Sequence, residues 1–287
     1  MARLIGGVGA SHVPSIYVAL DRGLRESPDW KPFFDGCVPC QEWAAQEKPD
    51  IAIVVFNDHG NAFFDKTPTF AIGCADRYMP IDEGYGVRDI SAFEGAPELS
   101  WHIIDRLVES HFDPMICQEL EVDHGLQVPM ELLWGRPEKW PVKVVPLLVN
   151  VIQYPIPTPA RCWELGKALR RAVDSYPTDE KIVVLGTGGL SHQLQGGRAG
   201  FINREADLRW LEDIASDPEK LRRMSRKDYV DMFGSEGAEL IMWLVMRGAL
   251  HETVDVIHRH YFAPASMTGV GMIVMEERPG LAKRGRS

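Results

Sequence analysis

The sequence has no apolar run long enough to cross a membrane. Its longest uninterrupted runs, residues 51–56 and 240–246, are far shorter than the roughly 18 residues that a spanning helix requires. Residues 4–10 are apolar but broken by glycine, and no signal-peptide core with a cleavage site follows them. We therefore expect a protein that does not enter a membrane and that resides in the cytoplasm.

Positive charge is also scarce. Lys and Arg number 31 against 41 Asp and Glu, which gives a formal net charge of −10 at pH 7. A surface of this sign repels phosphate backbones and anionic lipids. The charge balance therefore disfavours a broad surface for nucleic acid or for an acidic membrane.

Cysteines are few and odd in number. The five cysteines are scattered through a chain of 287 residues, which is long enough to form a core without disulfides. Cys37 and Cys40 have the C-x-x-C spacing, but a zinc site needs a second pair and a redox motif needs a strand-to-helix setting. We interpret the thiols as reduced and this spacing as coincidence.

The rest of the composition is that of an ordinary globular protein, with 45% hydrophobic and 25% charged residues. Short β-branched runs alternate with stretches of helical apolar spacing, which is typical of an α/β fold. No repeat or change of composition marks a boundary, so residues 1–287 are predicted to form one domain with a frayed tail at 278–287. Strands are predicted at 4–8, 51–56, 142–151, 181–185 and 269–275, and helices at 97–110, 161–173, 203–215 and 236–250.

Two local features refine this outline. Asn203 and Ser235 stand where helix N-caps are expected. Residues 60–95 are rich in Gly, Pro and Asp and lack periodicity, so they are predicted to be irregular and to lie near a functional site.

Histidines follow three of the predicted strands. His12, His59 and His192 each come within a few residues of an aliphatic run. One such histidine is more often structural than functional, but open α/β sheets bind their ligands beyond the carboxyl ends of the strands, and three in this position favour a site. His124 lies in a similar turn-like setting between Asp123 and a glycine. The other five are expected on the surface or in packing roles: His102, His111, His251, His258 and His260.

Two glutamates are candidates to complete a metal site. Glu236 and Glu239 open an apolar helical stretch, and their spacing of three places them on nearly the same face, so the pattern does not choose between them. Two imidazoles with one carboxylate are typical ligands of Fe(II) or Zn. Acids in a first helical turn also complement the helix dipole, which requires no metal.

Residues 186–189 (GTGG) form a glycine-rich loop ahead of Ser191. Its backbone amides are of the kind that cradle a phosphate or an oxyanion. The loop lacks the lysine of a P-loop and the full spacing of a dinucleotide-binding motif. A tight turn that presents His192 is the simpler interpretation.

Taken together, these segments resemble the class III (LigB-type) extradiol ring-cleavage dioxygenases, the family of the catalytic β subunit of protocatechuate 4,5-dioxygenase. The resemblance covers nearly the whole chain in the family's order and implies a central mixed sheet flanked by helices. It rests on residues 11–14 (SHVP), 57–59 (NDH), 68–75 (PTFAIGCA), 82–84 (DEG), 122–125 (VDHG), 186–196 (GTGGLSHQLQG) and 235–240 (SEGAEL).

The resemblance also implies a role for each candidate residue. His12, His59 and Glu239 would bind a non-haem Fe(II), which selects Glu239 over Glu236. His192 would be the catalytic acid/base, a role that suits a side chain whose ordinary pKa lies near neutrality. His124 would hydrogen-bond substrate or O2. The implied reaction is extradiol cleavage of a protocatechuate-like catechol by O2 in the breakdown of aromatic acids.

One departure from the family concerns the substrate. Where the family pattern is Pro-Ala-Ser-Asn-Thr, residues 264–268 read PASMT, so Ser266 is kept and Met267 replaces the asparagine. Methionine cannot donate to a carboxylate, so either the ring carries another substituent or the carboxylate is held from elsewhere. Gallate, 3-O-methylgallate and a non-acidic catechol remain alternatives, as do a zinc-dependent hydrolase and a non-catalytic subunit on the same fold.

The resemblance further implies a partner. The family's small helical α subunit, which caps the site, is not part of these residues, and gallate-type relatives carry an equivalent region fused to the chain. We expect either a separate α subunit or self-association that covers the site, and we favour the separate subunit in an α2β2 assembly.

Overall fold

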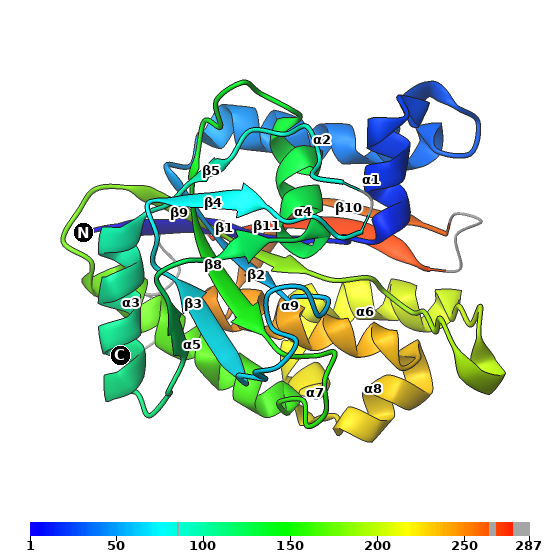
Figure 1. Ribbon diagram of the computed structural model, residues 1–287. Helices are drawn as coiled ribbons and strands as arrows, with labels where there is room; N and C mark the ends of the chain where they lie inside the picture. The colour runs from blue at the N-terminus through cyan, green and yellow to red at the C-terminus, as the bar shows by residue number, and fades with distance from the viewer. Residues whose placement is uncertain (85, 264–267, 278–287) are drawn as a thin grey trace.

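A mixed sheet runs through the middle of the molecule (Figure 1). The computed structural model describes residues 1–84, 86–263 and 268–277, so Ser266, Met267 and the tail predicted at 278–287 lie outside the described residues. The sheet contains β1 (Arg3–Ala10), β2 (Ile51–Phe56), β3 (Phe70–Gly73), β6 (Met115–Cys117), β8 (Lys143–Val149), β9 (Lys181–Thr187), β10 (Val254–Phe262) and β11 (Val270–Glu277). Their order across the sheet is β10-β11-β1-β9-β2-β8-β3-β6.

The central strands β1, β9, β2 and β8 are parallel to one another. Parallel strands are covered on both faces, which explains why β2 is apolar and buried along its whole length. Towards the edges, β11 is antiparallel to β1 and β3 is antiparallel to β8. The predicted α/β fold with a central mixed sheet is therefore confirmed, and each predicted strand corresponds to an observed one.

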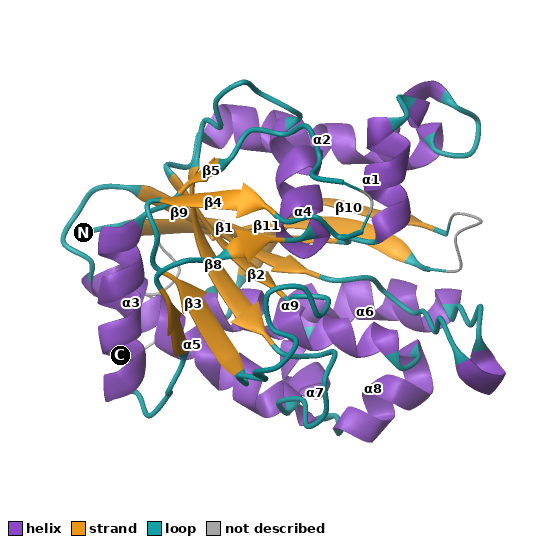
Figure 2. Ribbon diagram, viewed as in Figure 1, coloured by secondary structure: helices purple, strands orange, loops and turns teal. Residues whose placement is uncertain are grey.

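Helices cover both faces of the sheet (Figure 2). One layer contains α1 (Pro14–Asp21), α2 (Lys31–Glu47) and α4 (His124–Trp134), and the other contains α3 (Pro97–Glu109), α5 (Pro159–Ser175), α6 (Arg204–Ser216), α7 (Pro218–Arg223), α8 (Arg226–Phe233) and α9 (Leu240–Ala249). Alternate residues of β2 supply the two cores: Ile53 packs in the core of α5 and α9, and Val54 packs in that of α2 and α4. Among the described helices, none is long and apolar enough to cross a membrane.

The region predicted to be irregular is partly ordered, so that prediction was wrong in part. Residues 60–95 contain β3, β4 (Arg77–Pro80) and β5 (Phe93–Glu94). β4 lies between β5 and β7 (Glu121–Val122) in a small second sheet. These strands have only two to four residues each, too few to show a period of two in the sequence.

Of the two predicted N-cap residues, one caps its helix and the other does not. The Asn203 side chain caps α6 by accepting from the backbone N–H of Ala206 at 3.2 Å, as predicted. The stretch predicted at 236–250 begins instead as a 3₁₀ turn, η3 (Glu236–Glu239), before α9. Ser235 makes no side-chain cap there, because its hydroxyl donates to the Glu236 carboxylate at 2.5 Å. Two further 3₁₀ turns are η1 (Leu24–Glu26) and η2 (Gly196–Arg198).

Candidate active site

The site lies at the carboxyl ends of three adjacent strands. β9 lies between β1 and β2, and all three run parallel. His12 follows β1 and His59 follows β2, while β9 ends in Thr187 and leads into the glycine-rich loop. The strand order therefore brings together two histidines that are far apart in the sequence.

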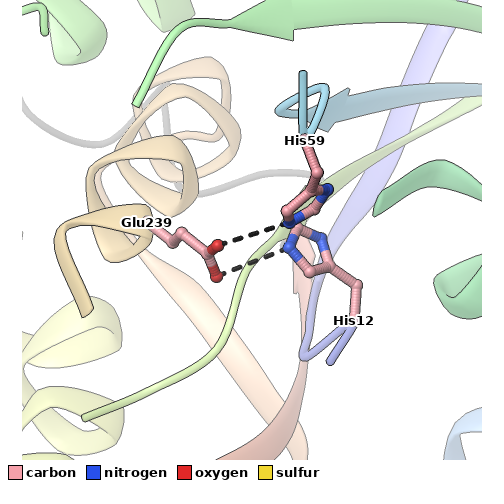
Figure 3. A group of neighbouring side chains, drawn as sticks. All are labelled: His12, His59 and Glu239. Carbon is pink, nitrogen blue, oxygen red and sulfur yellow. Dashed lines mark ion pairs between the residues drawn. The ribbon is translucent and has the colours of Figure 1, made fainter. Parts of the chain in front are cut away.

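Glu239 completes a group of three ligand-type side chains. Its carboxylate faces both imidazoles, with Oε2 3.4 Å from His12 Nε2 and Oε1 3.7 Å from His59 Nε2 (Figure 3). One donor atom from each residue lies within 4.8 Å of the others, an arrangement that can hold a metal ion. The structure places Glu239 here and Glu236 outside, where Glu236 accepts from the backbone N–H of Leu194 at 3.1 Å.

Each imidazole is oriented by a partner at its other nitrogen. His12 is buried, and its Nδ1 is hydrogen-bonded to the Thr187 hydroxyl at 2.9 Å. Its Nε2 is also buried and has no hydrogen-bond partner among the described residues. His59 donates to the Asp123 carboxylate from both its backbone N–H, at 2.7 Å, and Nδ1, at 2.9 Å. Both rings therefore direct Nε2 towards Glu239.

The charges of this group are strongly coupled. Burial alone would raise the pKa of Glu239, but the adjacent imidazoles of His12 and His59 lower it well below its ordinary value. Burial alone would lower the pKa of His59, but Asp123 and then Glu239 raise it to about 10. Asp123 is fully buried, and the neighbouring His59 outweighs that burial and lowers the pKa of this carboxyl. The neighbouring imidazoles thus favour the ionised forms of Glu239 and Asp123.

The glycine-rich loop holds Glu239 in place. The backbone N–H of Gly189 donates to Glu239 Oε2 at 2.6 Å, so the anion that this amide binds is a carboxylate of the chain itself. Gly188 has a φ of +131°, and a Cβ added there would lie 2.8 Å from Glu239 Cβ. Glycine at this position therefore allows the close approach of Glu239 to the loop.

His192 is buried beside the same loop. Its Nδ1 donates to the carbonyl of Leu190 at 2.8 Å, and a Cβ added at Gly189 would lie 2.7 Å from the ring. The preceding residue, Ser191, donates from its backbone N–H and its hydroxyl to Asp207 at 2.8 and 2.7 Å. Asp207 is buried on α6, so this pairing fixes the loop that carries His192.

His124 lies beside the group of three ligand-type side chains. Its ring stacks on that of His59, with centroids 3.9 Å apart and planes at 28°, and its centroid is 5.7 Å from that of His12. Burial and the neighbouring His59 lower the pKa of His124. All four histidines predicted for the site thus lie at this end of the sheet.

Sequence reasoning missed the residues that orient these histidines. Thr187, Asp123, Glu83 and Asp207 each contact a site residue or its loop across many residues of sequence. The acid before His124 was the one available signal, since Asp123 also caps α4 by accepting from the Gly125 N–H at 2.9 Å.

The remaining histidines and the C-x-x-C pair lie elsewhere. His102 is on α3, where Nε2 donates to a carbonyl of α5, and His258 is on β10, where Nε2 donates to the carbonyl of Gly36. Cys37 and Cys40 are buried on α2 as free thiols, and burial raises the pKa of Cys40 to about 12. In the described part of the chain, the groups able to hold a metal consist of histidines and carboxylates without cysteine.

A family model matches nearly all of this chain, and curated relatives match most of it. Residues 6–275 match the family model of the catalytic LigB subunit of aromatic ring-opening dioxygenase. Gallate dioxygenase of Pseudomonas putida is 45% identical over 197 residues, which are 69% of this chain and 58% of that protein. The 2,3-dihydroxyphenylpropionate/2,3-dihydroxicinnamic acid 1,2-dioxygenase of Comamonas testosteroni is 26% identical over 276 residues, 79% of this chain and 84% of that protein.

A solved structure shares the fold. An uncharacterized protein from Escherichia coli K12 superposes with a TM-score of 0.56 at 12% identity, covering 94% of this chain and 99% of that one. The chain therefore belongs to the LigB family, the catalytic subunits of aromatic ring-opening dioxygenases.

Proposed function

We propose that the chain opens the ring of a protocatechuate-like catechol beside the diol, with non-haem Fe(II) and O2, in the catabolism of aromatic acids. The observation that carries this proposal is the group formed by His12, His59 and Glu239, whose donor atoms lie within 4.8 Å of one another. Two imidazoles and one carboxylate are the ligand set of many non-haem Fe(II) oxygenases. The family match and the printed activities of the two relatives support the same reaction class.

The residues present fit an iron ion. A buried ring nitrogen without a hydrogen bond is unusual in a folded protein, and His12 Nε2 is such an atom within the described residues. The opposite nitrogens of His12 and His59 are held by Thr187 and Asp123, as is common for histidines that bind a metal. When bound, the iron would supply a redox centre at which the diol and O2 meet.

His192 is proposed as the acid/base for the hydroxyl protons. Its Nδ1 donates to the Leu190 carbonyl, which leaves Nε2 to take a proton from the diol and return it later. His192→Phe should retain iron and lose about 10²- to 10⁴-fold in kcat, the usual contribution of such a group. His102→Phe, on the half-buried face of α3, is the matched control and should keep both iron and turnover. Loss of iron from the His192 variant would contradict this assignment.

The deciding experiment is anaerobic reconstitution with Fe(II), followed by O2 uptake and absorbance when a catechol is added. We expect one O2 consumed per ring and a yellow ring-opened product. Reconstitution with Zn should give neither, and it separates this proposal from a zinc-dependent hydrolase. Absence of O2 uptake with every catechol at full iron occupancy, in an assembly whose site is covered, would refute the proposal.

Two substrates that differ in their ring substituents are the leading candidates. Protocatechuate is favoured by the family resemblance, and gallate by the 45% identity to a gallate dioxygenase. The chain spans 58% of that relative, and the substrate-facing candidates Ser266 and Met267 lie outside the described residues. We would compare kcat/KM for protocatechuate, gallate, 3-O-methylgallate and catechol in the wild type and in Met267→Asn. A shift towards protocatechuate in the variant would assign the substituent preference to Met267.

The site is further proposed to be covered by a small α subunit, in an α2β2 assembly, or by a second copy of the chain. Large apolar side chains are exposed on the loops that follow β2, β8 and β9, namely Phe64, Tyr154 and Leu194. The native mass of the chain expressed alone, measured by light scattering, tests the choice. A dimer with full turnover would favour self-association, and a monomer with low turnover would favour a separate subunit.

A further inference from the structure

A carboxylate outside the three-residue metal group faces His124. β4 and β7 pair in parallel, with Pro80 opposite Val122, and the backbone N–H of Ile81 continues the pairing to the Val122 carbonyl. Glu83 follows β4 and His124 follows β7. Because the carboxyl ends of parallel strands meet, this small sheet places Glu83 beside His124.

Both oxygens of Glu83 accept hydrogen bonds from His124. Oε1 lies 2.6 Å from the ring Nδ1, and Oε2 lies 3.1 Å from the backbone N. Since a carboxylate oxygen only accepts, Nδ1 carries a hydrogen. The opposite atom, His124 Nε2, is buried and has no hydrogen-bond partner in the part of the chain that the structure describes.

Arg88 anchors the segment that carries Glu83. Its guanidinium donates to the buried carboxylate of Glu131 at 2.5 Å, to Gln127 at 3.0 Å and to Asp21 of α1 at 2.9 Å. It also lies 4.9 Å from the ring centroid of Tyr17. Glu131 and Gln127 belong to α4, the helix that begins at His124, so Glu83 and Arg88 fasten the segment to the start and the middle of one helix.

We propose that Glu83 is the positioning residue of His124. By accepting the Nδ1 hydrogen, it fixes both the plane of the ring and the tautomer, so that His124 presents a bare Nε2 as an acceptor for a hydroxyl of the diol bound beside His59. This inference rests on the proposed function for the identity of the ligand. The pairing itself rests only on the contacts of Glu83, which allows the two to be tested separately.

The first test is a double-mutant cycle in the iron-loaded enzyme. Glu83→Ala should keep wild-type iron content and lower kcat by about 10- to 100-fold, the range typical when a hydrogen-bond partner of a histidine in a metal site is removed. In a His124→Ala background the same change should lower kcat by less than about twofold, because the ring it orients is gone. Glu94→Gln, at the exposed residue of β5 in the same small sheet, is the control and should leave kcat unchanged. An equal loss in both backgrounds would overturn the proposal.

The second test needs no turnover. In metal-free protein with ¹⁵N-labelled histidine, His124 should show a protonated Nδ1 and a bare Nε2, and its signals are assigned by their disappearance in His124→Ala. Glu83→Ala should shift the ring towards the Nε2-protonated tautomer. An unchanged tautomer would overturn the inference. If the wild type cleaves no catechol, the proposed function fails while the tautomer still decides the role of Glu83.

Discussion

Asp123 Oδ2 receives two hydrogen bonds from His59, one from the backbone N–H at 2.7 Å and one from the ring Nδ1 at 2.9 Å. The pair fixes the ring relative to its own backbone and turns Nε2 towards Glu239, 3.7 Å away. A metal-facing imidazole whose other nitrogen is bound to a carboxylate is both oriented and made more basic. The orientation of the His59 ring therefore depends on a residue 64 positions away in the sequence.

Replacement of Asp123 should weaken metal binding. Asp123→Asn keeps the shape of the side chain but removes its charge, and we expect an affinity for Fe(II) lower by about 10- to 100-fold. Titration of the apoprotein under anaerobic conditions measures this effect. Thr158→Ala removes the N-cap of α5, which accepts from the Arg161 N–H at 3.2 Å, and serves as a control that disturbs a helix start away from the site. An Asp123 variant with wild-type affinity would contradict the orienting role.

Glu239 and Glu236 form a matched pair of variants. Glu239→Gln should lose iron, because it removes the carboxylate that faces both imidazoles, whereas Glu236→Gln should bind iron normally. Thermal unfolding gives a second measurement, since a bound ligand at 100 times its Kd stabilises the fold by about 2.7 kcal/mol. Iron should therefore raise the Tm of the wild type and of the Glu236 variant but not that of the Glu239 variant. The reverse pattern would transfer the ligand role to Glu236.

A buried glycine, Gly188, and an exposed one, Gly197, both in the connection that follows β9, test the role of the loop. Gly188→Ala places a Cβ 2.8 Å from Glu239 Cβ at a positive φ, so we expect a loss of about 1 kcal/mol or more in unfolding free energy together with weaker iron binding. Gly197→Ala meets no heavy atom within 4 Å among the described residues and should change stability by less than about 1 kcal/mol. Chemical denaturation and metal analysis of both variants check the contrast. Equal behaviour of the two would show that Glu239 does not need the glycine.

The buried thiols predict a loss of stability at alkaline pH. Burial raises the pKa of Cys40 to about 12 and that of Cys117 to about 11, from an ordinary value of 9.0. Above about pH 9 the unfolded chain releases protons that the folded chain keeps, so the free energy of unfolding falls as pH rises, by at most about 1.4 kcal/mol per thiol and pH unit. Urea unfolding between pH 7 and pH 10 measures this slope, and Cys40→Ala should make it shallower. A thiol reagent that labels the native protein rapidly at pH 8 would contradict the burial of these groups.

The central strands are predictable from the sequence because each is a buried apolar run. β2 is observed with the bounds that were predicted, and β1 and β9 extend the predicted runs by one or two residues at their ends. β10 was missed because none of its residues is fully buried and because it includes His258 and His260, which indicated a polar connection. A continuous apolar run identifies a strand that is buried on both faces, whereas a polar edge strand offers no such run.

Some residues of the site were also predictable from the sequence, and others were not. The histidines that follow β1, β2 and β9 were identified from the rule that ligands gather at strand ends. The choice between Glu236 and Glu239 was not decided by spacing, because it depends on the 3₁₀ turn that directs one towards the sheet. The roles of partners such as Glu83 and Thr187 carry no local pattern, since their contacts depend on how distant strands pair.

The position of β9 between β1 and β2 has a consequence for how the protein folds during its synthesis. β1 and β2 belong to the first 56 residues, yet the space between them is filled by a strand that begins at Lys181. On the ribosome, the first two strands emerge with their shared neighbour still unmade, and Glu239 follows later still. Such non-local pairing slows folding. The nascent chain therefore cannot complete the central sheet until most of its length has been synthesised. Until then it also cannot bring His12, His59 and Glu239 together.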